Sequence, residues 1–304
     1  MEPKGKREAG SRLPERNRIL CAVGYLLAAL IGLALLLYPL ISNYLYETRQ
    51  DGVLVEYQEQ ANTLQTSEER EAVLEAARQY NRQLSTGILS LQDPFLTPTV
   101  AEEDGVRRSI LDVTGSGIIA TLSIPALSLE LPVYYGTDAE TLERGVGVLE
   151  ISSLPVGGEG THTVLCGHSG LSSAKLFSDL ELLEVGDQFS IGVMGNTLTY
   201  MVDRIVTVRP EDLSQLAIAP GEDYCTLLTC TPYGVNTHRL LVRGTRIEMP
   251  STEDNVETAI SPAEPVQSVW LREYAVSVLL SLSAVLGAVL VWRIVLLIRK
   301  RRQT

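Results

Sequence analysis

Three residues of the types used for nucleophilic acyl transfer stand at the ends of strand-like segments. Cys230 ends the apolar, β-branched run TLLTC, and Arg239 follows nine residues later, after the turn TPYGVNTH. His168 lies between two glycines at the end of another such run, GTHTVLCGHSG. A thiolate is a nucleophile, an imidazole within hydrogen-bond reach moves protons, and a guanidinium stabilises a developing oxyanion. We therefore predict that Cys230, His168 and Arg239 meet at one edge of a sheet. The alternative is that they are polar residues of two strands and a turn, with no catalytic role.

The other histidines and cysteines give weaker signals. His162 starts the strand that His168 follows, and we expect it to be structural. Cys166, Cys225 and Cys230 are an odd set, which in an oxidising compartment leaves a thiol without a disulfide partner. The alternative is that all three are buried and reduced. Two histidines six residues apart, with irregularly spaced cysteines, match no standard zinc pattern, so no metal is expected.

Short strands separated by glycine, proline and asparagine turns dominate residues 118–249. MGNTLTY is typical of a hairpin. Within this region, helical character is limited to segments near DAETLERGVG and SSAKLFSDLELL. Many short strands and few helices predict a mostly β barrel or sandwich. The expected strand segments are GIIATLSIPALSLELPVYYG, GTHTVLCGH, QFSIGVMGNTLTYMVDRIVTV, YCTLLTC and HRLLVRGTRIEM.

A charged, helical region precedes the strands. Residues 47–86 carry a helical pattern in which Ser67 is the expected N-cap, with acidic residues in the first turn. We expect this helix to be a strut packed on the domain, and the alternative is a partner-binding helix. The apolar residues at helical spacing are Val73, Leu74, Ala77 and Tyr80.

Two apolar segments are long enough to cross a membrane. Residues 19–41 contain no charge, and a second apolar run starts at Tyr274 and ends before the basic sequence RKRR. The first is expected to be a retained anchor, the alternative being a signal peptide. Residues 1–18 carry a net charge of +3 and residues 293–304 carry +5, whereas the whole chain carries −12, so the part between is strongly acidic. Both ends are therefore predicted to be cytoplasmic and the middle to be extracellular, and the acidity argues against a nucleic-acid partner.

The segment TLLTCTPYGVNTHRLLVRG, residues 226–244, resembles the active-site segment of sortases, the cysteine transpeptidases of Gram-positive cell surfaces. The form TCTPYGVNTHRLLVRG is similar to that of class C, the pilus-assembling sortases. The resemblance extends over about residues 118–249, through IPALSLELPVYYGTDAETLERGVGVLE, SLPVGGEGTHTVLCGH and SAKLFSDLELLEVGDQF. Two departures from class C are Ser169, where arginine is common, and Cys166, where many members have serine.

The resemblance implies a mostly β fold: a closed eight-stranded sortase-type barrel with short helices, an N-terminal helical region and two transmembrane helices. It assigns the nucleophile to Cys230 and the other catalytic positions to His168 and Arg239. It also implies that Asp93, Pro94 and Phe95, in the loop LQDPFL, form a lid whose aromatic ring rests over the cysteine. The alternative for this loop is a surface turn.

The activity implied is cleavage of an LPXTG-like sorting signal between Thr and Gly through a Cys thioester, followed by transfer to a lysine amine of the next pilin subunit. The resemblance implies no cofactor for this reaction. The expected partners are pilins that carry such signals, and the expected location is a two-pass membrane enzyme with an extracellular catalytic domain. The alternatives are a sortase that anchors proteins to the cell wall, a cysteine peptidase that only hydrolyses, and a non-catalytic membrane-anchored β-domain scaffold. The expected units are a cytoplasmic tail (1–18), a transmembrane helix (19–41), a helical region with the lid loop (42–108), the catalytic barrel (109–250), a linker (251–273), a transmembrane helix (274–298) and a cytoplasmic tail (299–304).

Overall fold

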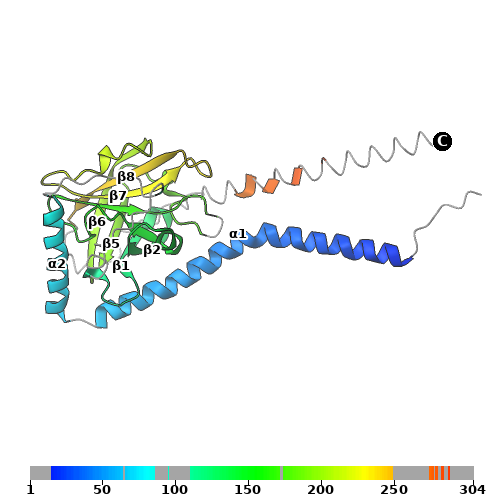
Figure 1. Ribbon diagram of the computed structural model, residues 1–304, viewed down its shortest axis with the longest axis horizontal. Helices are drawn as coiled ribbons and strands as arrows, with labels where there is room; N and C mark the ends of the chain where they lie inside the picture. The colour runs from blue at the N-terminus through cyan, green and yellow to red at the C-terminus, as the bar shows by residue number, and fades with distance from the viewer. Residues whose placement is uncertain are drawn as a thin grey trace, which may run out of the picture.

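A closed barrel of eight strands forms the centre of the computed structural model (Figure 1). The structure describes residues 15–63, 66–85, 95, 110–171 and 174–248, together with 274–276, 278–279, 282–283 and 287. Around the barrel the order is β1-β2-β3-β4-β7-β8-β6-β5, which confirms the predicted closed eight-stranded fold. The strands are β1 (Ile118–Ile124), β2 (Leu129–Tyr135), β3 (Val146–Val148), β4 (Thr161–Cys166), β5 (Gln188–Val193), β6 (Asn196–Val208), β7 (Asp223–Thr231) and β8 (His238–Ile247).

Alternate residues of the strands face two separate hydrophobic clusters. In β7, Cys225 and Leu227 belong to the large cluster that draws residues from β1, β2 and the other strands, which is the barrel interior. Leu228, one residue further on, belongs to a second cluster with Val164 of β4 and Leu241 of β8. Successive side chains of a strand point to opposite faces, so this second cluster lies on the outside of the barrel wall. This outer cluster, which also contains Cys166, Leu142, Leu149, Leu213 and Leu216, is the surface next to the candidate site.

The hairpin predicted at MGNTLTY joins β5 to β6. Val193 pairs with Asn196, so Met194 and Gly195 form a two-residue turn. Their φ angles are 50° and 79°, and positive values at both central positions are what a type I′ hairpin turn requires. The prediction is confirmed.

One of the two short helices expected within the strand region is correct and the other is wrong. α4 (Ala139–Arg144) begins after Asp138, whose side chain accepts a hydrogen bond from the Thr141 N–H. In contrast, the described part of SSAKLFSDLELL, residues 174–183, forms turns and a single 3₁₀ turn at Leu180–Leu182. Its apolar residues are spaced as in a helix, but Leu176 adopts a φ of 40°, which a right-handed helix does not allow.

The helix expected before the barrel is α2 (Ser67–Ser85), and it packs on the barrel as a strut (Figure 1). Leu74 and Ala77 are fully buried, and Val73 and Tyr80 pack against the same core. The N-cap is Thr66 and not Ser67: the Thr66 side chain accepts from the Glu69 N–H, and the Glu69 carboxylate accepts from the Thr66 N–H. This reciprocal pair is a capping box, and it moves the start of the helix by one residue.

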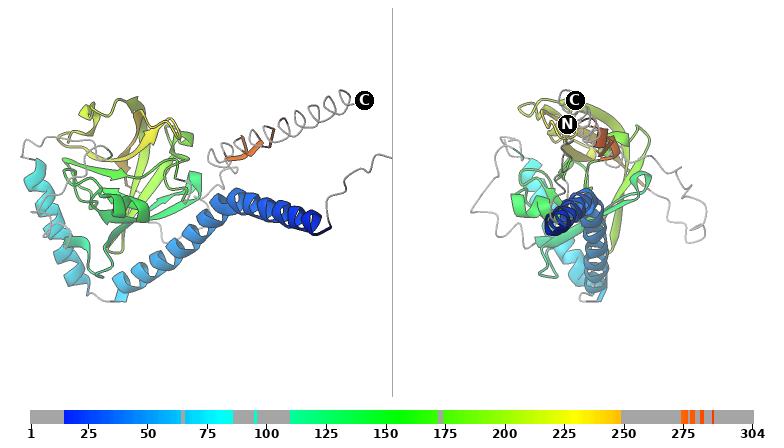
Figure 2. Two further views of the ribbon diagram at one scale, coloured as in Figure 1. Left: turned by 45° about the vertical axis from the view of Figure 1, so that its right-hand side comes forward. Right: turned by 90° about the vertical axis from the view of Figure 1, so that its right-hand side faces the viewer.

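α1 (Glu15–Thr63) is a single long helix whose first part projects away from the barrel and whose last part runs along it (Figures 1 and 2). It contains Pro39, and it changes direction near its middle, as proline-containing helices do. Among the described residues, one helical segment, Leu30–Tyr57, is long and apolar enough to cross a membrane, judged by length and composition alone. The second predicted span, from residue 274, lies mostly outside the described residues.

Candidate active site

Cys230 and Arg239 are direct neighbours across two antiparallel strands. Cys230 is the last residue but one of β7, and Arg239 is the second residue of β8. The register of the β7–β8 pair places them opposite each other. Residues directly opposite in an antiparallel pair have Cβ atoms about 4.5–5.5 Å apart, which brings the thiol and the arginine side chain into one local group.

His168 joins this group through the parallel pairing of β4 with β7. In that pairing Cys166 is level with Leu228, so two further residues along each strand His168 is level with Cys230. The backbone maintains the alignment beyond the end of β4, because the Gly167 N–H donates to the Leu228 carbonyl at 3.1 Å. The three side chains predicted to act together, separated by up to 71 positions in the chain, therefore lie in one row at the end of three adjacent strands.

The row faces outward, above the outer hydrophobic cluster. Cys166, Leu228 and Leu241, the next residues below it on the same face, are all buried in that cluster. Only 7% of the Cys230 surface is exposed. The thiol is therefore at the boundary between the apolar outer wall and the strand ends.

The Arg239 side chain is held by its own turn. It is 2% exposed, and its Nη1 donates to the carbonyl of Asn236 at 3.2 Å and to the carbonyl of His238 at 3.0 Å. Asn236 adopts a φ of 60°, a left-handed conformation that asparagine tolerates better than most residues. The β7–β8 turn thus fixes the guanidinium near the cysteine.

His168 is half-buried, and burial lowers the pKa of its imidazole below 6.5. The carboxylate of Glu143 opposes this change by favouring the charged form. A His168 side chain with a lowered pKa is mostly neutral at pH 7, and a neutral imidazole accepts a proton. Next to a thiol and a guanidinium, this arrangement suits a reaction in which protons are moved during acyl transfer.

Phe95 lies beside two residues of the row, His168 and Arg239. Its ring centroid lies 5.7 Å from that of His168, and the Cζ atom of Arg239 lies 5.2 Å from the ring centroid. The Phe95 side chain is partly buried against the outer cluster. One aromatic residue of the predicted lid therefore contacts two of the three predicted catalytic residues. Asp93 and Pro94 lie outside the described residues, so their part in the lid stays a prediction.

The family model of the sortase domain matches residues 122–247, which include the whole row. Among solved structures, sortase C-1 from Actinomyces oris is 43% identical with a TM-score of 0.56, and the match covers 59% of this chain and 99% of that one. Sortase C from Streptococcus pneumoniae is 42% identical with a TM-score of 0.59, over 65% of this chain and 97% of that one.

The chain belongs to the sortase family. Members of this family are cysteine transpeptidases. Sortase A of Bacillus anthracis is 32% identical over 127 residues, and the chain spans 59% of the length of that relative.

The other cysteines and histidines of the sortase lie away from the row or beneath it. His162 is 1% exposed, and its two ring nitrogens contact the Ala217 carbonyl at 3.0 Å and the Thr226 hydroxyl at 2.7 Å, which fits the structural role predicted for it. Cys225 faces the barrel interior, where burial raises the pKa of its thiol well above the usual value. Cys166, Cys225 and Cys230 are all buried and form no disulfide with one another.

Sequence reasoning missed the segment between β6 and β7. Leu213 and Leu216 of this segment are buried in the outer cluster, in the same cluster that Phe95 packs against. Ala217 presents its carbonyl to His162. The sequence signal for this segment was two leucines three residues apart in a loop. The surface that they pack against, the outer face of β4, β7 and β8, forms only in the folded barrel.

Proposed function

We propose that this sortase is a transpeptidase of the pilus-assembling class. It cleaves an LPXTG-like sorting signal between Thr and Gly and joins the new carboxyl end to a lysine amine of the next pilin subunit. The observation that carries the proposal is the row of His168, Cys230 and Arg239 beside the Phe95 ring. The similar sortase C of S. pneumoniae has pilin substrate specificity, which supports a pilin as the substrate here.

In the proposed reaction the neutral imidazole of His168 takes the proton of the Cys230 thiol, and the sulfur attacks the threonine carbonyl carbon and forms a C–S bond. The carbonyl electrons move onto oxygen, and Arg239 stabilises this oxyanion. As the C–N bond to glycine breaks, His168 gives a proton to the leaving amine. A lysine amine then attacks the thioester, His168 takes up its proton, and the thiolate leaves. One amide bond is broken and one is formed, so the reaction needs no external energy source.

The proposal includes a role for Phe95 in controlling substrate entry. Its ring occupies the space beside His168 and Arg239 that a sorting signal must enter. We propose that Asp93, Pro94 and Phe95 form a lid that the substrate displaces. Burial of one aromatic side chain contributes about 1.5–3 kcal/mol, so opening is energetically accessible.

We also propose that the sortase is anchored in the membrane at both ends, with the barrel outside the cell. Apolar residues on several sides of the first part of α1 are exposed, among them Leu27, Ile31 and Leu33, and a helix that is apolar all round needs an apolar environment. The hydroxyl of Tyr274 donates to the Leu36 carbonyl, which supports a second segment beside α1. Anchoring raises the effective concentration of membrane-bound substrates.

The test of the activity is cleavage of a fluorogenic LPXTG peptide by the full chain in detergent micelles, with and without an added amine. We expect cleavage, formation of the amide with the added amine, and no acyl-enzyme in Cys230→Ala. An active protein whose product is the free acid at every amine concentration would be a hydrolase and would contradict transpeptidation. Absence of any cleavage together with an unreactive Cys230 would favour a non-catalytic scaffold, and transfer to cell-wall amines but not to a pilin lysine would favour wall anchoring.

The topology has its own test. A protease-sensitive tag inserted at Gly195, in the β5–β6 turn, should be cut by protease added to intact cells, whereas tags fused to either terminus should be protected. Cleavage at either terminus would contradict the two-pass arrangement.

A further inference from the structure

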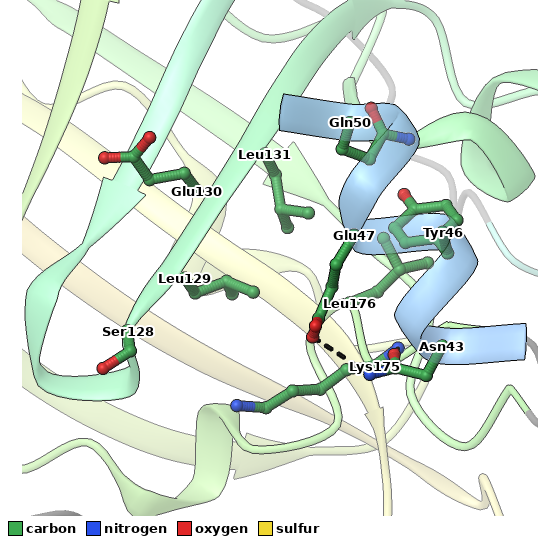
Figure 3. A pocket seen from close by; sticks show the side chains of 10 residues that line it. All are labelled: Asn43, Tyr46, Glu47, Gln50, Ser128, Leu129, Glu130, Leu131, Lys175 and Leu176. Carbon is green, nitrogen blue, oxygen red and sulfur yellow. Dashed lines mark hydrogen bonds between the residues drawn. The ribbon is translucent and has the colours of Figure 1, made fainter. Parts of the chain in front are cut away.

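One face of α1 lies against the barrel beyond the exposed apolar part. Asn43, Tyr46 and Gln50 are three and four residues apart, a spacing that places them on the same side of a helix. Figure 3 shows these side chains on the turns of α1 that border a cavity, which Leu131 of β2 and Lys175 also line. This polar face, here called the α1 clamp, makes long-range hydrogen bonds to two separate backbone segments.

The first segment is the end of α4. The Arg144 carbonyl accepts a hydrogen bond from the Tyr46 hydroxyl at 3.0 Å and another from Gln50 Nε2 at 2.6 Å. Gln50 is 9% exposed and its bond is partly buried, whereas the bond from Tyr46 lies at the surface. Two donors from one helix on a single carbonyl oxygen fix the position of the last turn of α4.

The end of α4 lies next to His168. In the antiparallel pairing of β3 with β4, Gly147 is level with Cys166. Continuing that register by two residues would bring Gly145, which directly follows Arg144, level with His168. Glu143, on the last turn of α4, is near enough to favour the charged form of the His168 imidazole. We therefore expect movement of the Arg144 carbonyl to displace the backbone on one side of the histidine.

The second segment follows His168 in the chain. Asn43 Oδ1 accepts from the Lys175 N–H at 2.8 Å. Two residues later, the Phe177 N–H donates to the His168 carbonyl at 3.0 Å, and Phe177 is buried. A Cβ atom on Gly167 would lie 2.7 Å from the Phe177 ring, so this ring packs directly on the backbone before His168. The contact at Lys175 thus controls the other side of the histidine.

We propose that the α1 clamp positions His168: Asn43, Tyr46 and Gln50 hold the two backbone segments that flank the histidine, so the helix that carries the apolar N-terminal segment also sets the geometry of the active site. The clamp residues are positioning residues, because they act through Arg144 and Lys175. The inference rests on the proposed acid–base role of His168, since only then does its position govern turnover.

The experiment compares substitutions in the full chain in detergent micelles. Tyr46→Phe combined with Gln50→Met removes both donors to the Arg144 carbonyl and keeps the side-chain volumes similar. Asn43→Leu removes the acceptor for the Lys175 N–H. Asn43→Asp retains the acceptor and is combined with Glu47→Gln, because Asn43 Nδ2 donates to the Glu47 carboxylate at 3.0 Å and two carboxylates there would repel each other. Thr48→Ala, on an exposed position of the same helix, is the matched control. The measurements are kcat and KM for peptide cleavage and the ¹³C resonance of the His168 imidazole as a function of pH.

We expect the double variant and Asn43→Leu to lower kcat about three- to tenfold with little change in KM, because each removes the equivalent of one or two hydrogen bonds. The His168 resonance should shift or broaden in the same variants. Asn43→Asp combined with Glu47→Gln should keep most of the turnover, and Thr48→Ala should match the wild type. An unchanged kcat and an unchanged His168 resonance in both clamp variants would overturn the inference. If the wild type itself has no turnover, the proposed function fails, and the His168 resonance alone then decides whether the clamp exists.

Discussion

His162 should make the barrel sensitive to acid. It is 1% exposed, and in the neutral form its ring nitrogens are matched to the Ala217 carbonyl and the Thr226 hydroxyl. Burial lowers the pKa of His162 to about 4; the hydrogen bond to the Ala217 backbone opposes this change, and the cation of Arg243 adds to it. In the unfolded chain the same imidazole has a pKa of about 6.5.

The sign follows from which state binds the proton. Between pH 6.5 and pH 4 the unfolded chain protonates His162 and the folded chain does not, so the free energy of unfolding falls as the pH falls. Each pH unit in this window lowers it by about 1.4 kcal/mol. From pH 7.5 to pH 4.5 the loss due to His162 is about 2.5 kcal/mol, and it is complete below pH 4.

The assay is urea unfolding of the full chain in detergent, followed by the near-ultraviolet circular dichroism of tyrosines. Tyrosine is the suitable probe because both tryptophans, Trp270 and Trp292, lie outside residues 118–247. The matched variant is His162→Gln, whose amide offers a donor and an acceptor but does not titrate. Carboxylates titrate in both proteins, so the difference between them isolates His162. If the wild type and His162→Gln lose the same stability to within about 0.5 kcal/mol, the reasoning from burial is refuted.

Three further predictions concern the site and the strut. Arg239→Lys should lose most of the turnover although the charge is kept, because an ammonium does not reproduce the planar fork of a guanidinium, and near-normal kcat/KM would contradict the role proposed for Arg239. Phe95→Ala should speed the alkylation of Cys230 by a bulky thiol reagent and raise the hydrolysis of a free peptide, with the fold intact; equal labelling rates would mean that the loop is only a surface turn. Asn81→Ala should lower the free energy of unfolding by about 1–3 kcal/mol, because it leaves the buried Leu154 N–H without its acceptor, whereas the Leu154 carbonyl still accepts from the Val156 N–H and the Thr163 hydroxyl. A loss below about 1 kcal/mol in urea unfolding would show that water replaces these bonds.

Much of the site could be predicted from local sequence, because the information is carried by short patterns. The β-branched runs before Cys230 and before His168 identify strands, and the glycines and proline that follow identify where the strands end. Residues at strand ends project from a sheet edge, so the sequence alone identified Cys230, His168 and Arg239 as candidate site residues. The β5–β6 turn and the buried face of α2 were predicted correctly for the same reason, because each depends on a pattern that spans only a few residues.

Only the tertiary structure decides which distant strands pair and in which register. The parallel alignment of β4 with β7 brings His168 level with Cys230 across 62 residues, and no local pattern specifies that register, because a slip of two residues preserves the same alternation. The helix expected around Phe177 failed for a related reason: its apolar spacing is helical, but its backbone is bonded to His168 instead. The α1 clamp likewise was not visible in the sequence, since polar residues on one face of a helix become contacts only when the barrel supplies the carbonyl of Arg144 and the amide of Lys175.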